Sequence, residues 1–452
     1  MKYRIREKNE LKPSGVEWLG DIPNDWEQIP LGRLGNFTSS GIDKLINENE
    51  SVVKIINFTD VYSNKAHILN SSFNYMKVTT PEKNRVKNLV KKGHLIFLPS
   101  SETYEDLGLS ALVDEELENT SFSYHVIRLQ FTKNIEHNFR KYLTNNNYIL
   151  NIFSSFGNGT TRKTLNRDVF KKIKVLMPPF FEQQKIANFL DEKSKIFDEA
   201  ISKKEQLISK LELAKQSLIS EVVTGKLKVV EQNSKLQTIK REKKELKLSG
   251  VEWLGDIPKD WQVKKSKYLF EIRKRIAGTL DFDVLSITQK GIKIKDIETG
   301  GGQLSMDYSK YQIVNIGDFA MNHMDLLTGF VDIAKVQGVT SPDYRVFSLI
   351  DKNSDSNFYL YLFQMGYKNQ IFFAFGQGSS QLGRWRFPTE EFNKFYFPYP
   401  SLEEQQKISK YLDEKLIHFD NTIEKTKQSI TKLKEAKEAL ISQAVTGKIE
   451  VL

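Results

Sequence analysis

The sequence predicts an α+β protein: two similar α/β globular domains separated by two long helices that pack as an antiparallel coiled coil with pseudo-twofold symmetry. Two repeats predict this class. A stretch with helical periodicity at 182–228 occurs again 222 residues later, without a gap. A shorter motif at 14–26 returns at 249–261, ahead of the second globular segment. Because the globular segments share little sequence, we expect a duplicated scaffold that carries two diverged domains.

These repeats divide the 452 residues into five parts. Residues 1–180 are expected to form the first globular domain with its N-terminal lead-in, followed by the central long helix at 181–228. Residues 229–248 are rich in lysine and glutamate, have no apolar periodicity between their ends, and are interpreted as a linker. The second globular domain follows at 249–402, and the C-terminal long helix occupies 403–452.

The lead-in motif is almost unchanged between its two copies. Residues 14–26 and 249–261 differ only at Asn24, which is replaced by Lys259. Two tryptophans, two glycines and a proline in so short a stretch indicate a rigid segment anchored by aromatic packing. A structural role is therefore favoured over a binding site.

The first globular segment, 27–178, mixes runs typical of short strands with runs typical of short helices. Apolar and alternating runs at 51–58, 94–98 and 126–131 predict strands, and 139–156 is expected to form a helix. These elements indicate one mixed α/β domain that ends where the long helix begins.

A glycine-rich polar loop, Gly-Asn-Gly-Thr-Thr-Arg-Lys at 157–163, follows the expected helix. The second globular segment, 262–400, aligns only loosely with the first, but it contains a matching loop that begins at Gly376. About three residues are added after this loop begins. The pattern indicates two modules of one fold, each recognising something different.

The helical repeat carries a heptad seam in both copies, with polar interruptions at Lys204 and Thr426. Each copy is expected to end at Thr-Gly-Lys, where glycine can adopt the left-handed terminating conformation. Such a seam is not stable alone in water, so its own copy is the expected partner. The residues expected to pack between the helices are Ile186, Leu190, Phe197, Ile201, Ile208, Leu211, Leu218, Ile408, Leu412, Phe419, Ile423, Ile430, Leu433 and Leu440.

The composition favours a soluble, cytoplasmic protein with no membrane partner. There are no cysteines, no run approaches the length of a membrane span, and the N-terminus lacks the apolar core of a signal peptide. The net charge of +10 and the pI near 9.2 suit a polyanionic partner.

Several segments resemble catalytic motifs, but none of them matches its motif fully. The loop at 157–164 resembles a phosphate-binding loop, but Arg162 replaces the glycine before the lysine. The run at 177–180, Met-Pro-Pro-Phe, lacks the Asn or Asp that amino-methyltransferases need to accept a hydrogen bond. The six histidines show no metal-ligand spacing. We therefore expect no catalytic residue, no metal and no cofactor in this chain.

The doubled Glu-Gln-Gln-Lys-Ile openings, the doubled Thr-Gly-Lys ends and the doubled Gly-Val-Glu-Trp-Leu-Gly-Asp-Ile-Pro motif together resemble the specificity subunits of type I restriction–modification systems. The resemblance covers essentially the whole chain. It implies a non-catalytic subunit whose two target-recognition domains bind double-stranded DNA. It also implies assembly with two methyltransferase subunits and with restriction (translocase) subunits, which supply the S-adenosylmethionine, Mg²⁺ and ATP chemistry.

If the chain reads DNA, polar side chains of each domain are expected to meet base edges in the major groove, while amides and lysines hold phosphates. Helices of this length match half-sites about one helical turn, roughly 34 Å, apart. The alternative for each residue is a solvent-exposed turn. The candidates are the two loops, with Thr160, Thr161, Arg162, Lys163, Ser379, Ser380, Gln381, Arg384, Trp385 and Arg386, and two positions after equivalent strands, with Ser100, Ser101, Asn322 and His323.

Two other classes of protein are compatible with parts of the sequence. One is a self-contained DNA methyltransferase or nuclease with fused recognition domains, although no stretch is left over to hold a cofactor domain. The other is a coiled-coil protein adaptor without nucleic-acid contact. Activity of the purified chain would distinguish the first, and the salt dependence of DNA binding the second.

Overall fold

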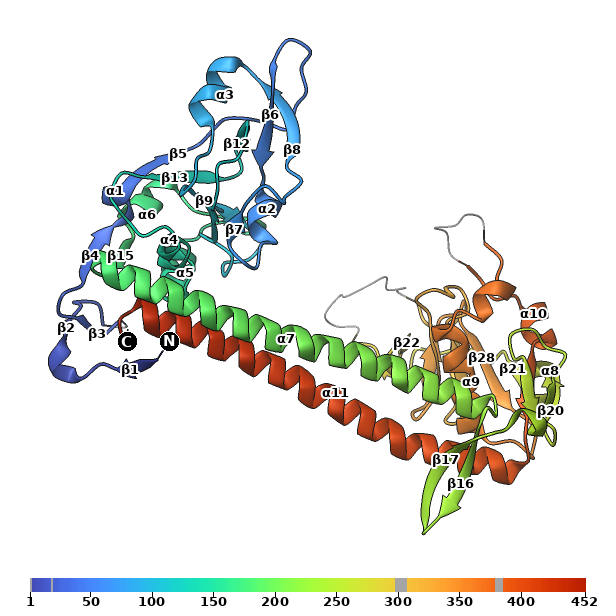
Figure 1. Ribbon diagram of the computed structural model, residues 1–452. Helices are drawn as coiled ribbons and strands as arrows, with labels where there is room; N and C mark the ends of the chain where they lie inside the picture. The colour runs from blue at the N-terminus through green and yellow to red at the C-terminus, as the bar shows by residue number, and fades with distance from the viewer. Residues whose placement is uncertain (1, 18, 297–306, 379–384) are drawn as a thin grey trace. The chain divides into compact units, whose positions relative to one another are not determined.

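The computed structural model describes residues 2–17, 19–296, 307–378 and 385–452 (Figure 1). The chain divides into two compact units. Unit 1 comprises residues 1–205 and 428–452, and unit 2 comprises residues 206–427. Each unit contains one globular domain together with a part of each long helix. The predicted class of two α/β domains with two long helices is confirmed.

The globular domain of unit 1 is built on a five-stranded sheet with the order β5-β13-β9-β11-β7, beside a three-stranded sheet with the order β12-β6-β8. The centre of the larger sheet is antiparallel, with Ile127 opposite Phe97. Aromatic side chains fill the core beneath it. The strands are β5 (Gly35–Thr38), β6 (Ser51–Ile56), β7 (Ile68–Leu69), β8 (Met76–Thr80), β9 (Leu95–Phe97), β11 (Ser110–Val113), β12 (Thr120–Phe122) and β13 (Ile127–Phe131).

The helix predicted at 139–156 is two helices, α4 (Phe139–Thr144) and α5 (Asn147–Ser155). Two asparagines cause the break. The side chain of Asn145 accepts from the amide of Ser110 at 2.9 Å, which ties this point of the chain to strand β11. Asn146 caps α5 by accepting from the amide of Ile149 at 3.1 Å. The prediction followed apolar periodicity and gave no weight to these side-chain caps.

The globular domain of unit 2 repeats this antiparallel centre. Its main sheet has the order β21-β28-β25-β26, and the phenylalanine-rich core includes Phe270, Phe319, Phe347 and Phe363. The elements are β21 (Phe270–Arg273), β22 (Leu285–Thr288), β23 (Gly291–Ile294), β24 (Gln312–Val314), β25 (Phe319–Met321), β26 (Val331–Ile333), β27 (Gly338–Thr340), β28 (Arg345–Leu349) and α9 (Ser356–Lys368).

Small paired strands connect each domain to its long helix in the same way in both units. β4 (Glu27–Pro30) pairs with β15 (Lys174–Met177), and β20 (Gln262–Lys265) pairs with β29 (Tyr396–Tyr399). The lead-in strands also correspond. The remaining equivalent elements are β2 (Leu11–Pro13), β3 (Asp21–Pro23), α1 (Leu31–Leu34) and α6 (Arg167–Lys172) in unit 1, and β18 (Leu246–Leu248), β19 (Asp256–Pro258), α8 (Ser266–Leu269) and α10 (Thr389–Lys394) in unit 2.

The two long helices are α7 (Phe180–Val223) and α11 (Leu402–Val445), each of 44 residues and therefore about 66 Å long. Both end before the predicted Thr-Gly pair, with φ of +77° at Gly225 and +71° at Gly447. Glycine suits these positions because a side chain is strained there. The chain leaves the helix at each Thr-Gly-Lys as predicted, but the predicted ranges 181–228 and 403–452 are too long, because strands β16 (Leu227–Gln232) and β30 (Ile449–Val451) follow the helix ends.

Within each unit the two helix segments run antiparallel (Figure 1). In unit 1, Lys437 Nζ lies 2.8 Å from Asp198 Oδ1, while the start of α7 shares a core with the end of α11. In unit 2, Lys215 Nζ lies 2.6 Å from Asp420 Oδ1. The second ion pair occupies the duplicated positions of the first. All fourteen predicted seam residues are buried or half-buried, with Ile186, Leu190, Ile201, Ile408, Leu412, Ile423 and Ile430 in the buried class.

A tryptophan lies at the helix junction of each unit, where the start of one long helix meets the end of the other. Trp26 is fully buried, and its Nε1 donates to Glu182 Oε2 at 2.8 Å. Trp261 is 1% exposed and donates to Glu404 Oε2 at the same distance. A Cβ on Gly447 would lie 2.3 Å from the Pro23 side chain, so the helix end fits closely against the lead-in. The structural role predicted for these tryptophans is confirmed.

The segment interpreted as a linker, 229–248, lies largely in secondary structure. Strands β16 (Leu227–Gln232) and β17 (Lys235–Lys240) form a hairpin whose turn places Asn233 and Ser234 at positive φ. In unit 1 the corresponding strands are β1 (Tyr3–Ile5) and β30 (Ile449–Val451). The register is the same, since Thr238 faces Val229 as Tyr3 faces Val451. The duplication therefore extends through this segment.

The equivalence continues after the hairpin. Arg6 forms an ion pair with Glu182, and Arg241 forms one with Glu404 at 2.6 Å. A single 3-10 turn with a glutamate capping box follows in both units, at Lys8–Glu10 and Lys243–Glu245. The lysine- and glutamate-rich composition of 229–248 concealed this repeat, because its apolar positions are few and its ion pairs are formed only in the folded chain.

Candidate nucleic-acid interface

In unit 1 the structure brings together two candidate segments that lie far apart in the sequence. Strand β10 (Ser100–Ser101) pairs antiparallel with β14 (Lys163–Thr164). Ser100 faces Thr164, and Ser101 faces Lys163. The glycine-rich loop therefore ends in a small two-stranded ladder, in which strand β14 pairs with Ser100 and Ser101. The sequence gave these as separate candidates, and the fold brings them together. The candidate Ser101 is corrected to a buried side chain, since it is 2% exposed and donates to Asp106 Oδ2 at 3.3 Å, whereas Ser100 is half-buried.

The loop is held in shape by its own lysine. Lys163 Nζ donates to the carbonyls of Gly159 at 3.0 Å and Thr160 at 2.5 Å, and it lies 4.7 Å from the centre of the Tyr104 ring. Gly159 has a φ of +118°, and a Cβ there would meet the carbonyl of Arg162 at 2.2 Å. The Lys163 ammonium group is thus engaged within the loop, whereas Thr160 and Thr161 are exposed.

Arg162 is exposed and is held on two sides. Its Nε donates to Ser100 Oγ at 3.1 Å, and its Cζ lies 5.5 Å from the centre of the Phe58 ring, within the range of a cation–π contact. Phe58 begins helix α2 (Phe58–Tyr62) and stacks on Tyr62 with ring centres 5.2 Å apart. Sequence analysis did not single out Phe58, because nothing in the chain order connects it with Arg162.

A cavity of about 340 Å³ opens beside this arginine. Lys44, Glu102 and His125 line it together with Arg162 and the two stacked rings. The pKa of His125 is lowered, first by burial and then by the charges of Lys44 and Arg162. The cavity therefore combines donors, one carboxylate acceptor, a neutral imidazole at pH 7 and aromatic faces, a set suited to base edges.

The corresponding region of unit 2 is only partly described. The candidates Ser379, Ser380, Gln381 and Arg384 lie outside the described residues. The base of the loop is closed by paired amides and carbonyls of Gln377 and Arg386, at 2.9 Å in both directions. Arg386 is exposed at this point.

Trp385 is half-buried and packs into the domain. Its ring centre lies 4.5 Å from that of Phe373, and a Cβ on Gly378 would lie 3.0 Å from its ring. These contacts make Trp385 a packing residue at the base of the loop. The wedge or stacking role expected for it would require the side chain to leave this position.

His323 is 6% exposed, and burial, followed by the charges of Arg345 and Arg386, lowers its pKa to about 3. The candidate His323 is therefore corrected to a buried, neutral side chain whose backbone carbonyl accepts from Phe387 at 2.8 Å. Asn322 is half-buried, and its carbonyl accepts from the hydroxyl of Tyr367 at 2.7 Å. A position just after a strand does not by itself indicate whether a side chain is buried or exposed.

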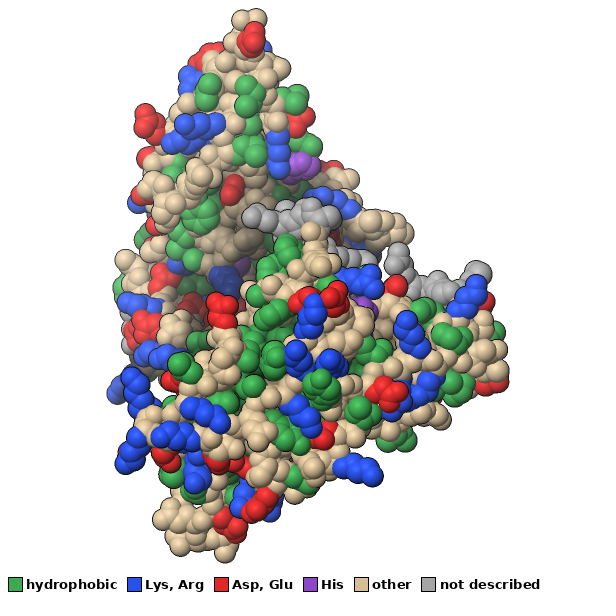
Figure 2. Space-filling model, turned by 90° about the vertical axis from the view of Figure 1, so that its right-hand side faces the viewer, with side chains coloured by type: hydrophobic (Ala, Val, Ile, Leu, Met, Phe, Trp, Pro, Cys, Tyr) green, Lys and Arg blue, Asp and Glu red, His purple; other side chains and the backbone are tan. Residues whose placement is uncertain are grey.

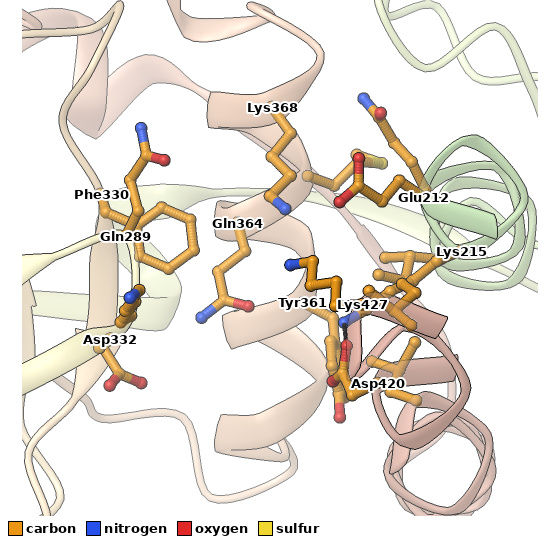
Figure 3. A pocket seen from close by; sticks show the side chains of 17 residues that line it. Glu212, Lys215, Gln289, Phe330, Asp332, Tyr361, Gln364, Lys368, Asp420 and Lys427 are labelled. Atoms are coloured by element: carbon orange, nitrogen blue, oxygen red, sulfur yellow. Dashed lines mark hydrogen bonds and ion pairs between the residues drawn. The ribbon is translucent and has the colours of Figure 1, made fainter. Parts of the chain in front are cut away.

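A second cavity, of about 720 Å³, lies in unit 2 between α9 and the segments of α7 and α11. The residues of α9 on its wall include Tyr361, Gln364 and Lys368 (Figure 3), and Gln364 Nε2 donates to the carbonyl of Val331 in β26 at 3.3 Å. Its lining contains both lysines and carboxylates, including the ion pair of Lys215 and Asp420. The mixture of charges indicates no particular anionic or cationic ligand.

The positive charge is spread out on the face shown in Figure 2, where lysines and arginines lie among acidic and hydrophobic side chains. Over the described ranges, no group of histidine and carboxylate side chains is arranged to hold a metal ion. In that same part of the chain, no helix has the length and apolar character needed to span a membrane.

The comparisons with known proteins agree with this geometry. Residues 23–213 and 258–435 match the family described as Type I restriction modification DNA specificity domain. The type I restriction enzyme MjaVIII specificity subunit of Methanocaldococcus jannaschii is 26% identical over 326 residues, covering 67% of this chain and 69% of that protein.

Two solved structures share the fold. A chain from a structure on complex assembly and conformational transition of the type I R-M system has a TM-score of 0.67 at 14% identity, covering 94% of this chain and 99% of that one. The HsdS subunit from Thermoanaerobacter tengcongensis has a TM-score of 0.50 at 14% identity, covering 94% and 98%. Because the family match includes both globular segments and most of both long helices, the chain belongs to the type I restriction modification DNA specificity family.

Proposed function

We propose that this chain is the sequence-specific DNA-binding subunit of a type I restriction–modification complex, and that it reads two different half-sites separated by a fixed gap. The strongest support is a contrast within the molecule. The two helix junctions have the same tryptophan–glutamate hydrogen bond at 2.8 Å, whereas the loops of the two domains differ in length and composition. A constant scaffold with variable loops suits the reading of two unlike sequences.

In this proposal the exposed loop residues contact DNA, and the long helices set the gap. Thr160, Thr161 and Arg162 in unit 1 and Arg386 in unit 2 are accessible for base or phosphate contact. Ser100 acts through Arg162, and Lys163 acts through the shape of its loop. The packed seam of α7 and α11 acts as the ruler.

We also propose that two methyltransferase subunits and the restriction subunits dock on the outer faces of the long helices and carry all the catalytic steps. Large apolar side chains remain exposed there. Ile196 is 54% exposed, Leu213 66% and Ile417 60%. Exposed apolar side chains on otherwise charged helices suit protein contacts. The purified chain alone is expected neither to methylate nor to cut DNA.

The first test is a titration of binding to genomic DNA fragments at increasing salt. A DNA-binding subunit should lose affinity linearly in log K against log salt, because bound phosphates release counterions. A chain that binds no DNA, alone or with its partners, would instead support the adaptor alternative. Methylation or cleavage by the chain alone would support the enzyme alternative.

The second test separates the two domains from the ruler. Replacing residues 27–178 with another recognition domain should change one half-site and leave the other unchanged. Inserting one helical turn, about four residues, into α7 should change the gap alone. Changed bases after the insertion would contradict the ruler, and two changed half-sites after the exchange would contradict independent domains.

A further inference from the structure

We propose that Arg162 reads a single guanine in the half-site met by unit 1, and that Phe58 and Ser100 are positioning residues for it. This inference rests on the proposed DNA-binding function and goes further by naming one base and one side chain. It begins from how the guanidinium group is held. Ser100 Oγ accepts from Nε at 3.1 Å, and the Phe58 ring lies 5.5 Å from Cζ.

These two contacts come from separate elements, strand β10 and helix α2. An exposed arginine ordinarily has many rotamers, and ordering it on binding costs free energy. Here the hydrogen bond fixes the edge of the guanidinium plane and the ring supports its face. Over the described residues, the two terminal amino groups of Arg162 have no hydrogen-bond partner. A fixed pair of parallel donors matches the O6 and N7 acceptors of guanine.

Lys44 and Glu102 both line the cavity beside Arg162, so its lining is mixed in charge and not purely cationic. The Glu102 carboxylate repels a phosphate, but it can accept from the amino group of cytosine, the partner of guanine. An arginine and a glutamate on the lining of one cavity therefore provide complementary groups for one G·C pair. Lys163 carries the other charge of the loop, but its ammonium group is bonded to loop carbonyls.

The experiment uses the assembled methyltransferase complex with the full chain, selecting bound duplexes from a random pool and sequencing them. With wild-type protein, one half-site should contain an invariant G·C pair assigned to unit 1. Arg162→Ala should relax that position alone, with discrimination against the other bases falling roughly 5- to 150-fold. Arg162→Lys keeps the charge but loses the fork, so it should relax the same position while the salt dependence of binding is retained.

Phe58→Ala and Ser100→Ala should relax the same position by a smaller factor, because the arginine remains but is less ordered. Arg33→Ala is the matched control, since Arg33 is an exposed arginine of the same domain and lies outside the cavity lining. Its selected sequences should equal those of the wild type. Thermal unfolding of every variant identifies any loss that arises from misfolding.

A phosphate contact at Arg162 predicts a different result. If Arg162 holds a phosphate, Arg162→Ala weakens binding to all sequences equally and lowers the salt slope by about one, with no position relaxed. That result overturns the guanine assignment and leaves the DNA-binding function standing. If the wild-type complex selects no sequence at all, the proposed function itself has failed.

Discussion

The helix junctions of units 1 and 2 are held by equivalent contacts, yet the loops of the two units differ. Trp26 and Trp261 make the same bond to Glu182 and Glu404, and the lead-in is held against a helix end in both. The loop of unit 1 is closed by Lys163 over Tyr104, whereas Trp385 packs on Phe373 at the base of the loop in unit 2. Residues of the helix junction therefore make the same contacts in both units, whereas residues of each loop make contacts found in that unit alone.

The largest effect is expected when the tryptophan of either junction is removed. This comparison tests whether the two junctions contribute equally to the free energy of unfolding. Trp26→Ala and Trp261→Ala each remove a buried indole and leave a cavity, and each should lower the free energy of unfolding by about 3–5 kcal/mol. Urea unfolding of the two variants provides the comparison. Trp26→Phe is the control that keeps a ring but leaves Glu182 without this donor. Strongly unequal losses for the two alanine variants would break the equivalence.

Acid titration compares one buried histidine from each unit. Burial, followed by the charge of Arg128, lowers the pKa of His94 to about 4, and the pKa of His323 is about 3, against about 6.5 in the unfolded chain. Because the unfolded chain binds protons that the folded chain excludes, this stability is complete above about pH 6.5. It falls as the pH drops, by about 1.4 kcal/mol per pH unit for each histidine.

Urea unfolding at pH 7 and pH 5 checks this expectation. His94→Gln and His323→Gln remove one titrating group each, so each variant should lose less stability between the two pH values than the wild type. The variant without either histidine should lose least. An unchanged pH dependence in the single variants would show that other groups control the acid response.

The duplicated ion pairs give a smaller and finer comparison. Lys437 with Asp198 and Lys215 with Asp420 are partly exposed, with both aspartates 62% accessible. Double-mutant cycles with alanine should give coupling energies of about 0.2–1 kcal/mol in each unit, and the two values should agree. Adding 0.5 M salt should weaken both couplings. A large coupling in one unit alone would show that its helix segments pack differently.

The smallest effect is expected from a circular permutant. Strands β1 and β30 pair in unit 1 as β16 and β17 pair in the hairpin of unit 2. Joining Leu452 to Met1 by a short linker and opening the chain between Asn233 and Ser234 should therefore change stability by less than about 1 kcal/mol. DNA binding should be retained. Loss of folding in the permutant would show that the hairpin connection itself is required.

The helical scaffold could be predicted from the sequence, because glycine ends and apolar spacing depend on neighbours along the chain. The break between α4 and α5 could not, because Asn145 is held there by a strand more than thirty residues away, through the amide of Ser110. The hairpin was missed because more than half of its positions are charged or polar. Its register became recognisable only beside β1 and β30.

Part of the candidate site could likewise be predicted from the sequence, and part is visible only in the folded structure. Arg162 was named from the composition of its loop, but the ring that supports it, Phe58, belongs to a distant helix, and only tertiary structure connects the two. Burial corrected His323, because a residue after a strand can face the core or the solvent, and the spacing is the same in both cases. Composition located the loops, and packing decided which side chains they present.

The pairing of β1 with β30 has a consequence for how the protein is made. Unit 2 is one continuous stretch, residues 206–427, so all of its contacts are available before residues 428–452 are synthesised. Unit 1 needs residues 428–452 as well, and Tyr3 can pair with Val451 only after that later segment has been synthesised. The domain translated first is therefore completed after the other, and strand β1 stays without its partner β30 during that interval.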